Sequence, residues 1–209
     1  MNTSSIIHRN GNNGKGILGG FFQMGGVTYG LSNNHVIADI NNCDVGDPIF
    51  DDANRVIGTL THWVELNSPN QGINLVDIAL FQYTAISVAN WLLPGGLVKP
   101  TGFTAPVEKG LVYFVRPDGS IQSGRIATAF TSVVMDLILC GVHFSFTHLT
   151  EIIPLNGGPF SEPGSSGSVV LSAYNNMLVG VVVGTSKDGT KSYAVPFADG
   201  VLKYLPLII

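Results

Sequence analysis

The chain has few charged residues, no cluster of basic residues and no long apolar run. Charged residues make up 11% of its 209 residues, and the formal net charge is −4. Without a basic patch, the chain lacks the electrostatic footprint of proteins that bind nucleic acid or anionic membranes. Its most apolar segment, 86–98, is broken by Asn90, Pro94 and two glycines, which excludes a membrane-spanning run of about 18 apolar residues. We therefore expect neither nucleic acid nor a membrane as a partner.

Cysteine is also scarce, because only Cys43 and Cys140 occur, far apart and without metal-ligand spacing. This favours a reducing compartment with both side chains buried as small apolar groups, and a disulfide is the alternative. The N-terminus has no basic start followed by an apolar core and a cleavage site, so no secretory signal is predicted. If Met1 is the native start, we expect a cytoplasmic protein.

What the chain does have is a composition typical of many short strands. Apolar residues make up 45%, and 26 glycines accompany short runs of Val, Ile, Phe and Tyr separated by turn residues. The pattern predicts an all-β protein of two antiparallel units, with a helical turn or two only at the C-terminal end. We expect a flexible N-terminal arm at 1–15, a first unit at 16–86, a linker at 87–106 and a second unit at 107–209.

One loop, "SEPGSSGSVV" at 161–170, is rich in Ser and Gly and runs into an apolar strand. A serine hydroxyl in such a loop needs a neighbouring base to become a nucleophile, most often an imidazole oriented by a carboxylate. His35 fits this role, because it follows an Asn-Asn turn and precedes the apolar residues 36–38, which would anchor the turn. Asp77 is an acid embedded in an apolar run, where it needs a polar partner.

The segments "NNHVI", "VDIAL" and "PGSSGSVV" resemble, in this order, the three signature regions of chymotrypsin-fold serine proteases. The gaps of 42 and 89 residues between His35, Asp77 and Ser166 are close to about 45 and about 93 in the family template. The first two segments are especially similar to the HtrA branch, and "FSEPGSSGSVV" to bacterial single-domain trypsin-like proteases. The resemblance covers about residues 16–206 and includes "VYFVRPDGSIQSGRI", similar to the opening hairpin of the family's second barrel.

This resemblance implies two antiparallel six-stranded β-barrels with a short C-terminal helix, and a serine endopeptidase that acts through an acyl-enzyme intermediate. It implies that Ser166 is the nucleophile, His35 the general base and Asp77 the residue that fixes the imidazole tautomer. The backbone N–H groups of Gly164 and Ser166 would form the oxyanion hole. It further implies a specificity pocket with an uncharged base, and small or medium apolar substrate residues, unless Glu162 turns inward. The pocket residues would be Phe160 at the floor and Val183, Gly184 and Thr185 along the wall.

Several alternatives remain open at this stage. The chain could be a catalytically silent protease-fold module that binds a peptide or protein, or an esterase that uses the same triad. The acidic stretch 44–54 lacks the regular oxygen alternation of a calcium loop, so we expect a solvated turn, no metal and no other cofactor. A protein or peptide is the expected substrate, and nothing indicates the oligomeric state.

The residue before the nucleophile bears on activation. Trypsin-like enzymes have an Asp there, which pairs with a newly cleaved N-terminus, whereas this chain has the neutral Ser165. A buried ammonium without a carboxylate would be strongly unfavourable, so that switch cannot operate here. The loop must be ordered by its own hydrogen bonds, for instance from the Ser165 hydroxyl, or by a bound substrate or partner. We therefore expect activity without N-terminal trimming and little effect of deleting residues 1–12.

Overall fold

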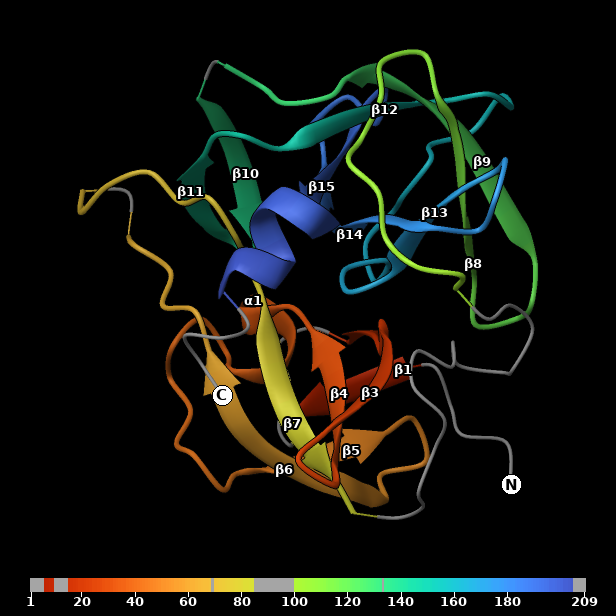
Figure 1. Cartoon of the computed structure of the whole chain (residues 1–209). Helices are drawn as coiled ribbons and strands as arrows, with labels where there is room; N and C mark the ends of the chain where they lie inside the picture. The colour runs from red at the N-terminus through yellow and green to blue at the C-terminus, as the bar shows by residue number, and fades with distance from the viewer. Residues whose placement is uncertain (1–5, 10–14, 69, 85–99, 133, 205–209) are drawn as a thin grey trace.

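The computed structural model describes residues 6–9, 15–68, 70–84, 100–132 and 134–204, and within them the chain forms two stacked β units (Figure 1). The first unit contains one short helix, α1 (Asn34–Ile37), at the end that faces the second unit. Its strands are β1 (Ile6–Arg9), β2 (Gly16–Ile17), β3 (Gly20–Met24), β4 (Val27–Ser32), β5 (Pro48–Asp51), β6 (Val56–Trp63) and β7 (Ala79–Tyr83). The predicted all-β architecture is confirmed.

The first unit is a curled antiparallel sheet in the order β2-β1-β5-β6-β7-β4-β3. Its two edge strands, β2 and β3, are separated in the chain by only Leu18 and Gly19, so the sheet must wrap round until its edges meet. The sheet has seven strands rather than six, because part of the predicted flexible arm is ordered. Ile6–Arg9 pairs with β2 and β5, and the Ile7 side chain is fully buried. By joining the sheet, this segment removes the apolar Ile7 side chain from water, which explains why part of the predicted flexible arm is ordered.

The second unit contains a closed six-stranded barrel in the order β12-β15-β14-β13-β8-β9. The β10-β11 hairpin, which lies between β9 and β12 in the chain, forms a separate two-stranded sheet. The strands are β8 (Leu111–Val115), β9 (Ile121–Thr128), β10 (Met135–Leu139), β11 (Val142–Phe146), β12 (Thr150–Pro154), β13 (Val169–Ser172), β14 (Leu178–Thr185) and β15 (Ser192–Pro196).

The connection between the units is described only in part. Most of the predicted linker, residues 87–99, lies outside the described residues. Residues 100–106 already belong to the second unit, because the Thr104 N–H donates to the Leu178 carbonyl at 2.9 Å and Phe103 bridges to the same residue. The predicted short C-terminal helix is present as a π-helical turn, Phe197–Val201. No described helix combines the length and apolarity needed to cross a membrane.

Three apolar clusters hold the fold together. One fills the first unit, where the ring centroids of Phe21 and Phe81 lie 4.5 and 6.4 Å from that of Tyr83. Another fills the closed barrel. The third joins the units, with Leu31 and Ile78 from the first and Phe197 from the second. Burial of apolar surface on this scale ties the units into one body, and the candidate site lies beside this shared cluster.

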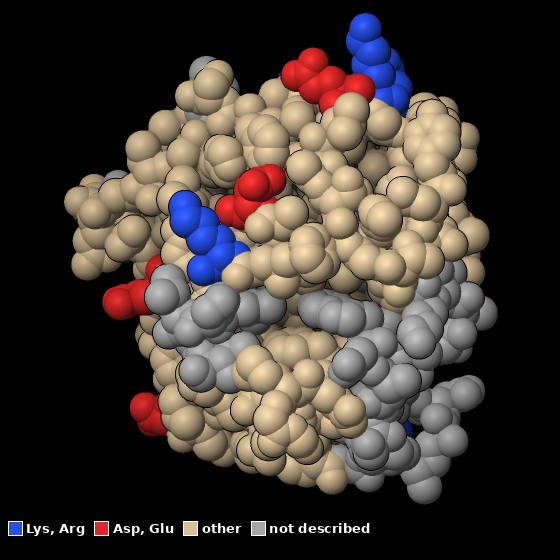
Figure 2. All heavy atoms as spheres, in the orientation of Figure 1, with Lys and Arg blue, Asp and Glu red and all other residues tan. Residues whose placement is uncertain are grey.

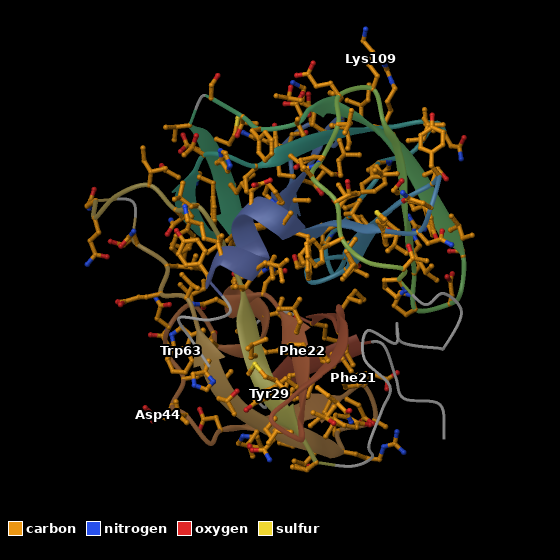
Figure 3. The ribbon with its side chains drawn as sticks, in the orientation of Figure 1. Phe21, Phe22, Tyr29, Asp44, Trp63 and Lys109 are labelled. Atoms are coloured by element: carbon orange, nitrogen blue, oxygen red, sulfur yellow. The ribbon has the colours of Figure 1, made fainter. Side chains whose placement is uncertain are left out.

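Charged side chains are sparse on the surface, as the composition requires. Figure 2 shows a few separated acidic and basic groups on a largely uncharged face. Figure 3 shows the aromatic residues Phe21, Phe22 and Tyr29 in the first unit and Lys109 at the far end of the second. Any charge that does lie near the candidate site therefore acts against a weakly charged background.

Candidate active site

His35 is positioned by α1, a single helical turn directly after β4. The chain enters this turn through Asn33, which is extended with φ −84° and ψ 154°. The next residues, Val36, Ile37 and Ala38, are buried in the first unit, as the sequence predicted. The Asn34 amide also donates to the Val64 carbonyl at 2.7 Å. The turn is thus anchored on its apolar side.

Asp77 is fully buried between Val76 and Ile78, and both of its oxygens are engaged by His35. The His35 ring Nδ1 lies 2.5 Å from Asp77 Oδ2, and the His35 backbone N–H donates to Oδ1 at 3.3 Å. The Asn33 amide donates to the Asp77 carbonyl at 2.6 Å. A carboxylate only accepts hydrogen bonds, so Nδ1 carries a proton, and in the neutral ring the lone pair is then on Nε2. This is the tautomer that a general base requires.

Ser166 lies in a tight loop between Gly164 and Gly167. Both glycines have positive φ, +93° and +91°, a conformation that side chains rarely adopt. A Cβ on Gly167 would also lie 2.2 Å from the Ile17 carbonyl oxygen. The Ser166 carbonyl in turn accepts from the Ile17 N–H at 2.7 Å. The first unit therefore holds the loop of the second through backbone contacts.

The Ser166 hydroxyl donates to the Val183 carbonyl at 3.1 Å. Val183 is the extra residue of a β-bulge, because the β14-β15 register shifts between Val182 and Gly184. Bulges redirect backbone groups, and this one coincides with the carbonyl that accepts from Ser166. Within the described residues, the hydroxyl makes this bond and makes none to His35.

The backbone amides of Gly164 and Ser166 can serve as oxyanion donors. Both residues line the same cleft, and in the described part of the chain neither N–H donates to another protein group. Two N–H groups of one loop that have no acceptor within the protein are suited to stabilising a developing oxyanion.

The Ser165 side chain closes this loop from within. The Glu162 N–H donates to the Ser165 hydroxyl at 3.2 Å, and the Ser165 N–H donates back to the Glu162 carbonyl at 2.9 Å. The Ser168 N–H donates to the Ser165 carbonyl at 3.1 Å. Of the two ordering mechanisms left open by the sequence, the loop's own hydrogen bonds are therefore present.

A cleft of about 460 Å³ brings His35 and Ser166 together. Three of the four predicted pocket residues, Val183, Gly184 and Thr185, also line it. Phe160 does not, which corrects the predicted floor. Its ring is fully buried in the closed barrel, with its centroid 5.2 Å from that of Phe114.

The residue that takes the place of Phe160 is its neighbour Ser161, which lines the cleft. Phe160 and Ser161 lie in a bend outside the strands, and here the Phe160 ring packs into the barrel core while Ser161 lines the cleft. Glu162 also lines the cleft, but its carboxylate lies 3.1 Å from Arg116 Nη2.

Several lining residues carry no recognisable sequence signal. Lys15 and Lys187 come from loops, and Ile138, Leu139 and Cys140 come from the end of the β10-β11 hairpin. Cys140 is exposed, contrary to the prediction that both cysteines are buried, while Cys43 is buried as predicted. The Cys140 sulfur donates to the His35 carbonyl at 3.6 Å. Although the residue as a whole is exposed, partial burial of its sulfur, together with the nearby Asp39 and Asp77 carboxylates, raises the pKa of the Cys140 thiol, which disfavours the reactive thiolate.

Among the described residues, no three His, Cys, Asp or Glu side chains are grouped to hold an ion. Two acidic side chains of 44–54, Asp47 and Asp51, bond to groups within the same segment or next to it. The Asp51 carboxylate, for example, lies 2.6 Å from Arg55 Nη2.

Solved structures share this architecture over nearly the whole chain. Protease A of Thermobifida fusca superposes with a TM-score of 0.67 and 16% identity, covering 98% of this chain and 95% of its own. The Nocardiopsis protease gives 0.66 and 15% identity, with 98% and 95% covered. A glutamic acid-specific serine protease gives 0.65 and 14% identity, with 97% and 96% covered. The chain therefore has the chymotrypsin-like fold of bacterial serine proteases.

Comparison of the sequence itself finds no such relatives. No protein-family model matches the chain, and no curated protein matches it. At these identities the likeness establishes the fold, and the activity has to be argued from the site.

Proposed function

We propose that the protein is a serine endopeptidase that cleaves peptide bonds through an acyl-enzyme formed on Ser166. The observation that carries this proposal is the buried His35–Asp77 pair, at 2.5 Å, in the same cleft as Ser166. A buried carboxylate that orients an imidazole beside a serine is an arrangement suited to acyl transfer. The protease fold supports the choice of a peptide as substrate.

The proposed steps use only groups of this chain. Ser166 Oγ attacks the peptide carbonyl carbon while His35 Nε2 takes the hydroxyl proton, and the N–H groups of Gly164 and Ser166 stabilise the oxyanion. His35 then gives the proton to the leaving amine, and the acyl group stays on Ser166. Water, deprotonated by His35, attacks the acyl carbon, the bond from that carbon to Ser166 Oγ breaks, and His35 returns the proton to Ser166 Oγ as the acid is released. Before the first step, the Ser166 hydroxyl must turn from the Val183 carbonyl toward His35.

That required rotation is the observation that favours the second candidate, a catalytically silent module that binds a peptide in the cleft. A fluorophosphonate probe separates the two, because it reacts with an activated serine and not with a fold.

Substitution of the triad tests the proposal. Ser166→Ala and His35→Ala should each abolish hydrolysis of a casein-derived peptide while the circular dichroism spectrum stays unchanged. The double variant should be no slower than either single variant by a large factor, since triad members act as a unit. Near-wild-type hydrolysis by either single variant would refute the assignment.

A further inference from the structure

We propose that the cleft selects substrates with an acidic side chain, Glu or Asp, at the residue whose carbonyl is attacked. This inference rests on the proposed function and names its substrate class. It replaces the apolar preference expected from the sequence, which depended on Phe160 as the pocket floor. With Phe160 in the barrel core, the pocket presents hydroxyl groups instead.

The hydroxyl groups form a chain that links the two walls of the cleft. Ser161 Oγ lies 2.8 Å from Thr185 Oγ1 and 2.8 Å from Ser192 Oγ, and the Ser161 N–H donates to Ser192 Oγ at 3.0 Å. Ser161 and Ser192 are almost completely buried, whereas Thr185 is half-buried and lines the cleft. Ser161 and Thr185 thus present hydroxyl groups in the cleft, and the buried Ser192 bonds to Ser161.

The protons of this chain can be directed into the cleft. Each hydroxyl has one proton to donate. Ser161 uses its proton to donate to Ser192 Oγ at 2.8 Å, which leaves the Thr185 proton outside the Ser161–Ser192 bond. The Thr185 proton bonds the Ser161 carbonyl at 3.0 Å in this structure and can turn to an acceptor in the cleft. A substrate carboxylate is a strong acceptor, and hydrogen bonds to a charged acceptor are the stronger kind.

The charges around the cleft favour an anion as well. Lys15 and Lys187 line it, and no carboxylate of a described residue lies within ion-pair distance of either ammonium. The one acidic lining residue, Glu162, is paired with Arg116 at 3.1 Å. A substrate Lys or Arg would meet two like charges, while a carboxylate would meet two opposite ones.

The loop that carries Lys187 is held in place by its neighbour. Asp188 Oδ1 accepts from the hydroxyls of Ser186 and Thr190 at 2.6 and 2.8 Å, and the Lys191 N–H donates to the Ser186 hydroxyl at 3.0 Å. Asp188 itself does not line the cleft. Lys187 is therefore presented from an ordered turn, although its exposure limits the strength of its attraction.

The first test compares matched fluorogenic tetrapeptides that differ only in the residue before the scissile bond, Glu, Gln, Met or Lys. We expect kcat/KM to be highest for Glu and lowest for Lys. Thr185→Val should lower kcat/KM for Glu and Gln about tenfold and leave Met within about twofold. Thr185→Ser, which keeps the hydroxyl, should retain the Glu preference.

The cation is tested separately. Lys187→Met should reduce the Glu to Gln ratio about threefold, because an exposed charge pair contributes little more. Lys109→Met is the matched control, since Lys109 lies at the far end of the second unit (Figure 3) and does not line the cleft. It should leave the ratio unchanged. An equal loss in both variants would show that only net charge matters and would contradict the role of Lys187.

A binding measurement separates failure of this inference from failure of the proposed function. Ser166→Ala protein is titrated with fluorescein-labelled tetrapeptide amides ending in Glu, Gln or Met, and anisotropy reports the affinity. Labelling of wild-type protein by fluorophosphonate together with preference for the Met substrate would overturn the acidic pocket and leave the protease proposal standing. Absence of labelling with preferential binding of the Glu peptide would overturn the protease and support the pocket. Absence of both would overturn both.

Discussion

At the scale of single residues, Asp77 contributes orientation rather than proton transfer. Its two oxygens accept from the ring and the backbone N–H of His35, so the imidazole is fixed in both tautomer and direction. The Asp77→Asn variant keeps the shape but presents an amide that can donate to Nδ1. The proton would then move to Nε2, where it blocks the base. We expect kcat to fall about 10⁴-fold with KM little changed, measured by steady-state hydrolysis. A loss under tenfold would contradict this role.

Gly167 is the residue where backbone conformation and space coincide. Its φ is +91°, and an added Cβ would lie 2.2 Å from the Ile17 carbonyl oxygen and 2.6 Å from the Ser32 hydroxyl. Gly167→Ala should therefore displace the nucleophile loop from the first unit. We expect loss of phosphonate labelling and a decrease of about 1–3 kcal/mol in the free energy of unfolding, measured with urea.

Gly26→Ala is the control for that variant. Gly26 has a similar φ of +81°, but nothing lies within 4 Å of its added Cβ. It should show the backbone cost alone and keep full labelling. Equal labelling of the two variants would mean that the contact with Ile17 does not position the loop.

At the scale of elements, β1 supports the loop that carries Ser166 through its neighbour β2. It pairs with β2, whose Ile17 N–H donates to the Ser166 carbonyl, and Ile7 fills the core of the first unit. Deleting residues 1–12 should therefore lower both stability and activity, contrary to the expectation from sequence. Ile7→Ala should cost about 2–5 kcal/mol of unfolding free energy, because it leaves a cavity in a packed core. Wild-type urea midpoints for either variant would contradict the role of β1.

The β14-β15 turn gives a prediction that depends on pH. Hydrogen bonds from the Ser186 hydroxyl, and then from Thr190, lower the pKa of Asp188 to about 2 from the ordinary value of 3.8. Because the folded pKa is depressed, the turn's stabilisation is fully present above the ordinary value and is lost as the pH falls toward about 2. Carbon-detected NMR titration should show this low pKa, and Ser186→Ala should raise it toward 3.8. Identical titrations of the two proteins would exclude the Ser186 bond.

At the scale of the whole molecule, local sequence patterns and long-range contacts contribute different parts of the account. The strands and the two-unit division follow from short apolar runs and turn residues, which act locally. The expectation that His35, Asp77 and Ser166 form one site comes from the resemblance of three segments to chymotrypsin-fold proteases. The ordering of β1 does not follow from local patterns, because β1 pairs with β2 and β5, which come together only in the folded sheet. The prediction of Phe160 as the pocket floor was wrong for a related reason. Phe160 and Ser161 are adjacent, and only packing against Phe114 decides which of them faces the core.

The site also depends on contacts that join the two halves. Cys140 lies in the tight turn of a hairpin that reaches the His35 carbonyl, and Lys187 comes from the loop after β14. The positions of Cys140 and Lys187 at the site cannot be predicted from residue spacing in the sequence, since each requires the two units to be packed through their shared apolar cluster. The two units bring His35 and Ser166 into one cleft, which neither unit could form alone.

The most direct test of the proposed activity is to identify by mass spectrometry the residue that a fluorophosphonate modifies in full-length protein. We predict a single adduct on Ser166, formed without prior proteolysis and absent from the His35→Ala variant. Absence of an adduct in the folded wild-type protein, or an adduct on Ser161 or Ser165 instead, would contradict the assignment of Ser166 as an activated nucleophile.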